Sequence, residues 1–380
     1  MLPSLVAEEL RGSLSSFLGT TFALADDDVR TALEQFLSDP VNGVFRGPYV
    51  RLRLPFRPAE AGWEELLGFV PARFIPHRHQ AQAWARLSSR GRDPQPTLVT
   101  TGTGSGKTES FLVPLLDHCR RERGRPGIKA IVLYPMNALA NDQARRIAAM
   151  IHAHPDELGG VTAGLYTGDA PATVAMSAEA VIGDRHALRR HPPDILLTNY
   201  KMLDMLLLRG EDAPLFAGAG TSLRYLVLDE FHTYDGAQGT DVAMLLRRLG
   251  MTLGTGDEHG PLGRITPVAT SATLGTGTDS AAALRDFAGT VFGTPFEADS
   301  IISEDRLHPQ EWAGSTEGAV PLLDDVTDTL AGCATHGQVV EATARVFLGH
   351  LPRTPLHSAR RYAATRSPPG SSPSPGPPVR

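Results

Sequence analysis

Several features are scarce in this 380-residue chain, and each scarcity excludes a class of protein. Only two cysteines occur, Cys119 and Cys333, and neither lies in a Cys-x-x-Cys or Cys/His cluster, so we expect neither a disulfide framework nor a zinc site. No apolar run reaches the length of about 18 residues that a membrane span needs. Glu8 and Glu9 interrupt the stretch that a signal peptide would use. The sequence therefore predicts a cytoplasmic protein with no membrane partner.

Positive charge is not in excess either. The 36 Lys and Arg residues are outnumbered by 42 Asp and Glu residues, which gives a formal net charge of -6. A domain that binds nucleic acid through an overall basic surface would have a pI above about 9. The charge weighs against such a surface, but a protein that grips a strand through backbone amides and hydroxyls needs only a local basic path. With 41% hydrophobic and 21% charged residues, the composition is that of a globular enzyme.

The length suits about two folded units at roughly 100 to 200 residues each. Near the N-terminus, 5–18 and 27–37 are helix-like, and the alternation at 49–56 predicts a strand. The final stretch is so rich in Pro, Ser, Gly and Arg that we expect it to be disordered. The pattern divides the chain into an N-terminal accessory segment, a nucleotide-binding domain, a helical extension and a disordered tail, at 1–70, 71–297, 298–351 and 352–380.

The central part alternates short β-branched runs with helical segments, which is typical of βαβ units. It predicts an α/β fold with a mainly parallel sheet flanked by helices. Each candidate strand ends in a polar or glycine-containing loop, and in such sheets ligands bind where the carboxyl ends of the strands meet. The candidate strands are 97–101, 130–134, 161–166, 194–199, 223–229 and 265–272.

The loop after the first of these strands reads TGTGSGKT and opens a helix-like run. Its glycines would let backbone N–H groups cradle phosphates at a helix N-terminus. Lys107 would then reach the β- and γ-phosphates, and the Thr108 hydroxyl would bind Mg²⁺. Thr101 stands where the strict pattern has glycine, and the alternative is a glycine-rich turn with an accidental Lys-Thr pair. The expected nucleotide-binding loop is Thr101, Gly102, Thr103, Gly104, Ser105, Gly106, Lys107 and Thr108.

A second motif, LVLDEFH, ends an apolar strand in two adjacent carboxylates. Asp229 would hold Mg²⁺ through water, and Glu230 would orient and deprotonate the water that attacks the γ-phosphate. His232 would sense the state of that phosphate. Alone, such a pair is more often a helix cap or a solvated loop. The separation from Lys107 leaves room for several βα units, so both motifs can lie at one crevice.

A third motif, ATSATL, also ends a strand. The small hydroxyls of Ser271 and Thr273 could bond His232 and couple the nucleotide to the rest of the domain. In isolation this is only a strand rich in Ser, Thr and Ala, and it gains weight as the third member of an ordered series.

These three motifs together resemble those of the DEAD/DEAH-box helicases of superfamily 2, of the DExH type. YPMNALANDQ, YTGD and LLTNYKMLD lie between them and resemble the family's strand-binding motifs, and IPHRHQAQAW resembles its Q motif. YPMNALANDQ and DEFHTYDGAQGTD look closest to large bacterial helicases with an uncharacterised C-terminal domain. The resemblance covers about 49–310 and implies a RecA-like domain that binds ATP and Mg²⁺, with Gln80 reading the adenine edge. It favours DNA as the strand and leaves RNA open.

The resemblance also implies that the ends of three β-strands contact the nucleic acid. Amides, hydroxyls and glycines at such positions suit a grip on phosphates without reading bases. Ordinary turn and cap chemistry is the alternative. Arg145 and Arg146 would extend a basic path or form a solvated face. The residues expected to hold the strand are Pro135, Asn137, Asn141, Thr167, Gly168, Thr198 and Asn199.

One expected part is missing from the sequence. A complete helicase of this type has a second RecA-like domain, and that domain supplies an arginine finger worth about 10³ to 10⁵ in rate in related NTPases. No second strand series or Q-x-x-G-R-x-x-R-like motif follows residue 297. Two main hypotheses remain: an ATP-dependent DNA helicase or translocase completed by a second chain, or a truncated or regulatory nucleotide-binding module with little turnover. A weaker third is a P-loop ATPase with no nucleic-acid role, which only the acidic net charge supports.

Overall fold

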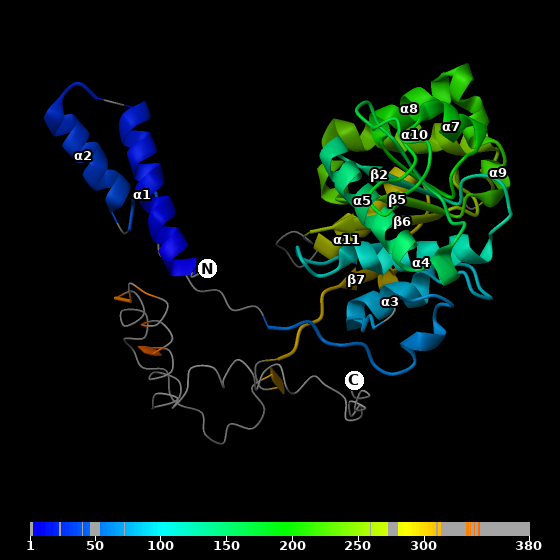
Figure 1. Cartoon of the computed structure of the whole chain (residues 1–380), viewed down its shortest axis with the longest axis horizontal. Coiled ribbons are helices and arrows are strands. Elements are labelled where there is room, and N and C mark those ends of the chain that lie inside the picture. The colour runs from blue at the N-terminus through cyan, green and yellow to red at the C-terminus, as the bar shows by residue number, and fades with distance from the viewer. Residues whose placement is uncertain are drawn as a thin grey trace, which may run out of the picture. The chain divides into compact units, whose positions relative to one another are not determined.

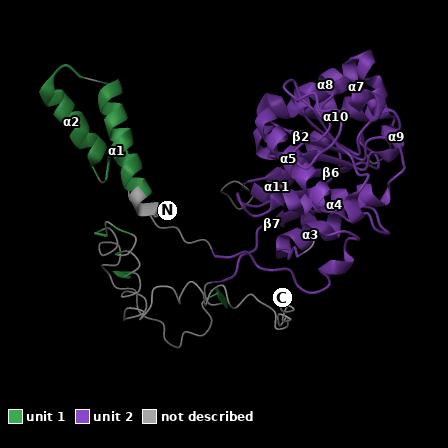
Figure 2. Cartoon of the chain, viewed as in Figure 1, with its two compact units in different colours: residues 1–53, 309–380 green, residues 54–308 purple. Residues whose placement is uncertain are grey.

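The structure is a computed structural model that describes residues 3–22, 24–39, 41–45, 54–71, 73–258, 260–272 and 280–308, with a few residues beyond 310. Contacts divide the chain into two compact units (Figure 2). One unit consists of residues 54–308, and the other of residues 1–53 and 309–380. The expected tail at 352–380 and most of the expected helical extension at 298–351 lie outside the described residues.

The unit 54–308 is built on a seven-stranded, fully parallel sheet (Figure 1). Its strand order is β3-β4-β2-β5-β6-β1-β7. This confirms the predicted α/β class with a parallel sheet. The strands are β1 (Thr97–Thr100), β2 (Ala130–Tyr134), β3 (Ala163–Tyr166), β4 (Ile195–Asn199), β5 (Tyr225–Leu228), β6 (Thr266–Ser271) and β7 (Ile301–Ser303).

Helices cover both faces of this sheet, which explains why its strands read as continuous apolar runs. In β2, Val132 packs into the cluster formed with α4 and α5, whereas Ile131 and Leu133 pack into the cluster formed with α8, α10 and α11. The helices are α3 (Arg78–Leu87), α4 (Lys107–Arg121), α5 (Asn137–Ala153), α6 (Pro155–Leu158), α7 (Arg185–Arg190), α8 (Tyr200–Leu208), α9 (Ala219–Ser222), α10 (Gly236–Leu253) and α11 (Ser280–Phe292). Short 3-10 turns are η1 (Trp63–Glu65), η2 (Gly210–Phe216), η3 (Phe231–Thr233) and η4 (Ala298–Ser300).

The edge strand β7 was not predicted from the sequence. It pairs with β1, with Leu98 opposite Ile301, and is too short to show a period. Beyond it, Arg306 forms an isolated antiparallel bridge with Phe56. The strand predicted at 49–56 lies mostly outside the described residues, and its described end contributes only that bridge. The compact unit therefore extends further at both ends than the expected domain at 71–297.

The N-terminal residues form two helices, α1 (Pro3–Thr21) and α2 (Asp27–Ser38), as the sequence predicted. The Asp26 side chain caps α2 by accepting hydrogen bonds from the backbone N–H groups of Asp28 and Val29. Two acidic residues in the first turn add a favourable interaction with the helix dipole. Among the helices that the structure describes, none has the length and apolar character to cross a membrane.

Two leucines test how far the stability of unit 54–308 depends on the buried sheet. Leu133 in β2 is 0% exposed and Leu208 at the end of α8 is 66% exposed. We predict that Leu133→Ala lowers the free energy of unfolding by about 2 to 5 kcal/mol, because it leaves a cavity in the core. Leu208→Ala should change it by less than about 0.5 kcal/mol. Urea unfolding followed by circular dichroism measures both, and equal losses would contradict the assigned core.

Candidate active site

The three motif-bearing loops meet because their strands are neighbours in the order β5-β6-β1. Thr100 lies opposite Ser271 in the register of β1 and β6, and the Thr101 backbone N–H donates to the Ser271 carbonyl at 3.2 Å. Leu228 lies opposite Ala269 in β5 and β6. The loops that follow these residues therefore leave the same edge of the sheet side by side.

The loop at 101–108 requires glycine at two positions. Gly104 and Gly106 have φ values of 80° and 78°, in the left-handed region that favours glycine. Gly106 is also the N-cap of α4, and a Cβ there would stand 2.2 Å from the Gln80 side-chain nitrogen. The loop is thus shaped so that α4 begins directly at Lys107, with its free N–H groups facing the loop.

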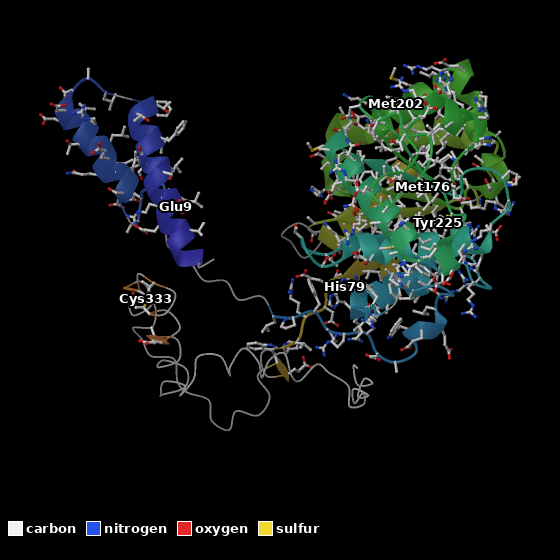
Figure 3. The ribbon with its side chains drawn as sticks, viewed as in Figure 1. Glu9, His79, Met176, Met202, Tyr225 and Cys333 are labelled. Atoms are coloured by element: carbon white, nitrogen blue, oxygen red, sulfur yellow. The ribbon has the colours of Figure 1, made fainter. Side chains whose placement is uncertain are left out.

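Thr101, the departure from the strict glycine pattern, has a structural role. Its side chain is buried and its hydroxyl is 2.6 Å from the Ser105 hydroxyl, which closes the loop across its base. The Ser105 carbonyl accepts a hydrogen bond from His79 Nε2 at 2.9 Å, which places the ring proton on that nitrogen. Burial lowers the pKa of His79, so the neutral ring is favoured. His79 lies on α3, where Figure 3 labels it.

Gln80 is held against the loop by both ends of its amide. Its oxygen accepts from the His77 backbone N–H at 2.8 Å, and its nitrogen donates to the Gly106 carbonyl at 3.1 Å. The side chain is only 2% exposed. Gln80, which was predicted to read the adenine edge, therefore lies against the loop at 101–108 with a fixed orientation.

Together these elements enclose a cavity of about 420 Å³. It is bordered by the loop, the start of α4, the segment before α3, one carboxylate from the DEFH motif and one arginine from α5. The lining residues are Phe74, Ile75, His77, Gln80, Thr103, Gly104, Ser105, Gly106, Lys107, Thr108, Glu109, Arg146 and Glu230. Neither Glu109 nor Arg146 was assigned to the nucleotide by the sequence.

Asp229 is a buried carboxylate at the end of β5. It is 6% exposed and accepts a hydrogen bond from the Thr270 hydroxyl, which itself accepts from the Glu230 backbone N–H at 3.2 Å. Burial raises the pKa of Asp229, and the bond from Thr270 opposes that rise. Sequence reasoning missed Thr270, although the motif containing it was singled out.

Glu230 adopts a backbone conformation that is rare for a residue with a side chain. Its φ of 49° and ψ of 50° are left-handed, a strain that usually marks a functional constraint. Its side chain stands 3.5 Å from Lys107 Nζ through one oxygen and 3.5 Å from His232 Nδ1 through the other. His232 Nδ1 is in turn 3.4 Å from the Ser271 hydroxyl. A chain of polar contacts thus joins the three motifs, while Thr273 lies outside the described residues.

The residues expected to hold the nucleic acid lie at the carboxyl ends of the other strands of the sheet, which follow the order β3-β4-β2. Asn199 donates to the Asn137 side-chain oxygen at 2.7 Å and caps α8 through the Met202 backbone N–H. Pro135, Asn137, Asn141 and Asn199 are half-buried, and Gly168 is exposed.

Two hydroxyls of that set point inward. Thr198 is 0% exposed and donates to the Tyr166 carbonyl at 2.6 Å. Thr167 is 1% exposed. The Thr198 hydroxyl therefore braces the end of β3, whereas the Thr167 hydroxyl is buried without a hydrogen-bond partner among the described residues. Asn141 lines a cavity of about 250 Å³ with Arg145 and Asp169, between α5 and the loop after β3.

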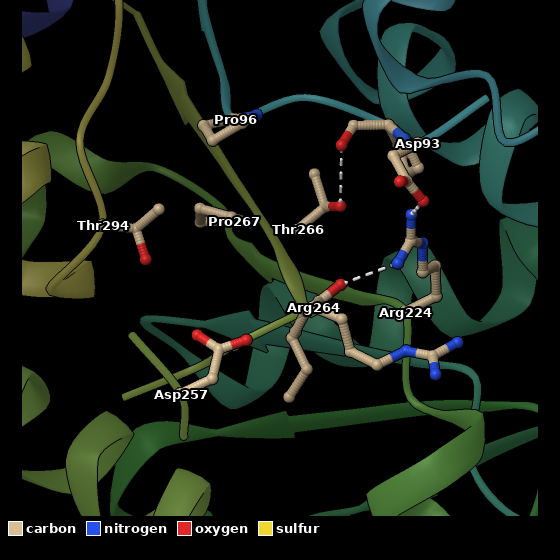
Figure 4. A pocket seen from close by; sticks show the side chains of 11 residues that line it. Asp93, Pro96, Arg224, Asp257, Arg264, Thr266, Pro267 and Thr294 are labelled. Carbon is tan, nitrogen blue, oxygen red and sulfur yellow. Dashed lines mark hydrogen bonds and ion pairs between the residues drawn. The ribbon is translucent and has the colours of Figure 1, made fainter. Parts of the chain in front are cut away.

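A further cavity, of about 530 Å³, lies at the opposite edge of the sheet, where Thr266 begins β6 (Figure 4). Its polar groups are largely paired with one another. Arg224 pairs with Asp93 and donates to the Arg264 carbonyl at 2.9 Å, and the Thr266 hydroxyl donates to the Pro94 carbonyl at 3.2 Å. None of the motifs reaches this cavity.

The sequence model of the DEAD/DEAH box helicase family matches residues 77–280, which is more than half of the chain. The chain belongs to this family. The matched region contains all three motif-bearing loops and the strands that position them. The predicted family is thereby confirmed.

Known relatives are much longer than this chain. The chain is 28% identical over 312 residues to Druantia protein DruE of Escherichia coli (strain UMEA 4076-1), covering 56% of this chain and 17% of that protein. It is 29% identical over 245 residues to the Lhr helicase/uracil glycosylase of Escherichia coli (strain K12), covering 60% of this chain and 14% of that protein. It is 23% identical to a solved DUF1998 helicase, MrfA, bound to DNA and AMPPNP, with a TM-score of 0.47, covering 66% of this chain and 30% of that one. The chain thus spans about a sixth of the length of these two curated relatives.

The raised pKa of Asp229 gives a pH-dependent prediction. A carboxyl whose pKa is raised on folding contributes stability below its ordinary value of 3.8, and that contribution is lost as pH rises through the raised pKa. At pH 8 the buried charge therefore lowers stability, and we predict that Asp229→Asn raises the urea midpoint. The gain should shrink as pH falls toward 4. Asp142→Asn, at an exposed position in α5, should leave the urea midpoint unchanged at both pH values. A lower midpoint for Asp229→Asn than for the wild type at pH 8 would contradict the raised pKa of Asp229.

Proposed function

We propose that unit 54–308 is the ATP-binding domain of an ATP-dependent nucleic-acid helicase or translocase that works in the cytoplasm. The observation that carries this proposal is the contact chain from Lys107 through Glu230 and His232 to Ser271. It joins the three motifs, and two of its members, Lys107 and Glu230, line the cavity. Membership of the DEAD/DEAH box helicase family supports the same reading.

ATP would bind with its phosphates against the loop at 101–108. Backbone N–H groups at the start of α4 and the Lys107 ammonium would hold the β- and γ-phosphates. Gln80 would face the adenine. The Thr108 hydroxyl and the Asp229 carboxylate are hard oxygen donors of the kind that Mg²⁺ prefers, and the burial of Asp229 leaves its charge in need of a cation. These residues fit Mg²⁺, which would neutralise charge on the phosphates.

Glu230 would take the proton of the attacking water. Its contact with Lys107 places it at the phosphate end of the cavity, and its left-handed backbone directs the side chain there. His232 and Ser271 would relay the position of Glu230 to β6. Glu230 therefore has the role of general base and His232 that of a positioning residue.

The strand would lie along the ends of β2, β3 and β4. Asn137, Asn141, Gly168 and Asn199 offer amides and backbone groups there, and such groups hold phosphates without reading bases. Pro135 would shape the loop, and the buried Thr167 and Thr198 would support it from within. We propose DNA as the bound nucleic acid. The residues of the motifs look most like those of large bacterial helicases with an uncharacterised C-terminal domain, and that resemblance favours DNA.

A second candidate function is nucleotide binding with little turnover. Within the described lining of the cavity, Arg146 is the arginine, and it already pairs with Glu109. An arginine finger contributes about 10³ to 10⁵ in rate in related NTPases. It would then have to come from outside unit 54–308, from a second RecA-like domain. Without it the site would hold ATP as a regulatory module.

Steady-state ATP hydrolysis with and without single-stranded DNA separates the two candidates, with Lys107→Ala as the blank. We predict turnover that rises when DNA is added, because a helicase couples ATP hydrolysis to the binding of a nucleic-acid strand. Nucleotide binding without turnover above the blank would favour the regulatory module. Failure to bind nucleotide at all would contradict both functions. A single-stranded RNA of the same length, run in parallel, tests the choice of DNA.

The two charged residues at the phosphate end should fail in different ways. Lys107→Ala should lose nucleotide binding, because it removes the cation that holds the phosphates. Glu230→Gln should keep binding and lose about 10²- to 10⁴-fold in single-turnover hydrolysis, because an amide cannot accept the proton. A fluorescent ATP analogue measures binding. An equal loss of binding in both variants would refute the role given to Glu230.

A further inference from the structure

Arg146 enters the nucleotide cavity from an unexpected element. It lies on α5, the helix that begins at Asn137, and it lines the cavity together with Lys107 and Thr108. It pairs with Glu109 in the first turn of α4. The sequence had assigned this arginine to a basic path along the strand or to a solvated face.

The pair that Arg146 forms is incompletely satisfied. The Glu109 side chain is only 10% exposed, and one of its oxygens faces Arg146. The other oxygen is buried without a hydrogen-bond partner among the described residues. Arg146 keeps 43% of its side chain exposed and has five N–H donors, so it can hold Glu109 and still bind a second anion. The buried Glu109 carboxylate thus holds the Arg146 guanidinium beside the cavity and leaves some of its N–H donors available for a ligand.

The geometry of α5 explains how one helix serves both halves of the edge. Arg146 lies nine positions after Asn137, and at 1.5 Å per residue this corresponds to about 14 Å along the axis. At 3.6 residues per turn the two side chains lie on faces about 180° apart. Asn137 contacts Asn199 at the end of β4, whereas Arg146 pairs with Glu109 of α4 and lines the cavity. The same helix therefore presents an amide to the strand-facing loops and a cation to the nucleotide.

We propose that Arg146 is a nucleotide-binding residue that contacts the phosphate chain while Glu109 holds its guanidinium in place. The proposal rests on the proposed function, since it requires that the cavity bind ATP. A charge-assisted hydrogen bond from a guanidinium to a phosphate is both strong and directional. Arg146 would add such a bond to those of Lys107 and the loop.

The test measures the affinities of ATP, ADP and adenosine for the full chain by competition with a fluorescent ATP analogue. Arg146→Ala should weaken ATP and ADP by about 5- to 30-fold, because a bond to a charged group is lost at a partly exposed site. Adenosine, which has no phosphate, should bind as it does to the wild type. The ATP affinity of Arg146→Lys should lie between those of the wild type and Arg146→Ala, because lysine keeps the charge without the fork geometry of the guanidinium. Arg123→Ala removes an exposed arginine after the far end of α4 and should change nothing.

A second variant tests the part played by Glu109. Glu109→Gln keeps the shape of the side chain but removes the charge that holds the Arg146 guanidinium in place, so ATP should bind less tightly than to the wild type. In the Arg146→Ala background the same change should have a smaller effect, and the difference measures the coupling between the two residues.

Each failure has a distinct meaning. If Arg146→Ala binds ATP like the wild type while Lys107→Ala does not, the inference is overturned and the proposed function stands. An equal loss for ATP and adenosine would show that Arg146 only maintains the fold of the cavity, which also overturns the inference. If the wild type binds no nucleotide, the proposed function fails and the inference fails with it.

Discussion

The strand order of the parallel sheet is the constraint on which the rest of the structure depends. Strands far apart in the sequence become neighbours in β5-β6-β1, and the register between them places Thr100 beside Ser271 and Leu228 beside Ala269. This order brings the carboxyl ends of the three motif strands side by side. The strands β3, β4 and β2 form the other half of the edge, so the sheet divides its carboxyl ends into two adjacent areas.

The polar site is maintained against an unfavourable local energy. Asp229 carries a burial-raised pKa, and Glu230 holds a left-handed backbone conformation. Both features oppose folding locally, and the apolar clusters on the two faces of the sheet must offset them. Such stored strain is common where a protein must present charged groups to a ligand that is itself charged. The same rigid frame then fixes the orientation of Lys107 and Gln80.

Much of this arrangement could be predicted from the sequence, because local patterns set it. The six predicted strands appear within about two residues of their expected bounds, and both N-terminal helices are present. The loop at 101–108, the carboxylates at the end of β5 and the contact of His232 with Ser271 follow from motifs that each occupy one loop. The family assignment rested on the same residues and is confirmed.

What could not be predicted depends on contacts between distant elements. The three-residue strand β7 exists because it pairs with β1. Thr270 is important because the sheet places it beside Asp229, and Arg146 because α5 packs so that this residue faces α4. The burial of Thr167 and Thr198 is another tertiary property that a strand-end position alone does not reveal.

The division of the sheet edge into a nucleotide half and a strand half is the central claim, and photo-crosslinking tests it most directly. Single-stranded DNA carrying a photoreactive backbone group would be crosslinked to the full chain, and the attachment sites mapped by mass spectrometry. Crosslinks at 135–141 and 167–169, unchanged when an ATP analogue fills the other half, are the predicted result. Crosslinks at the loop 101–108, or at the opposite edge around Asp93 and Asp257, would contradict the account.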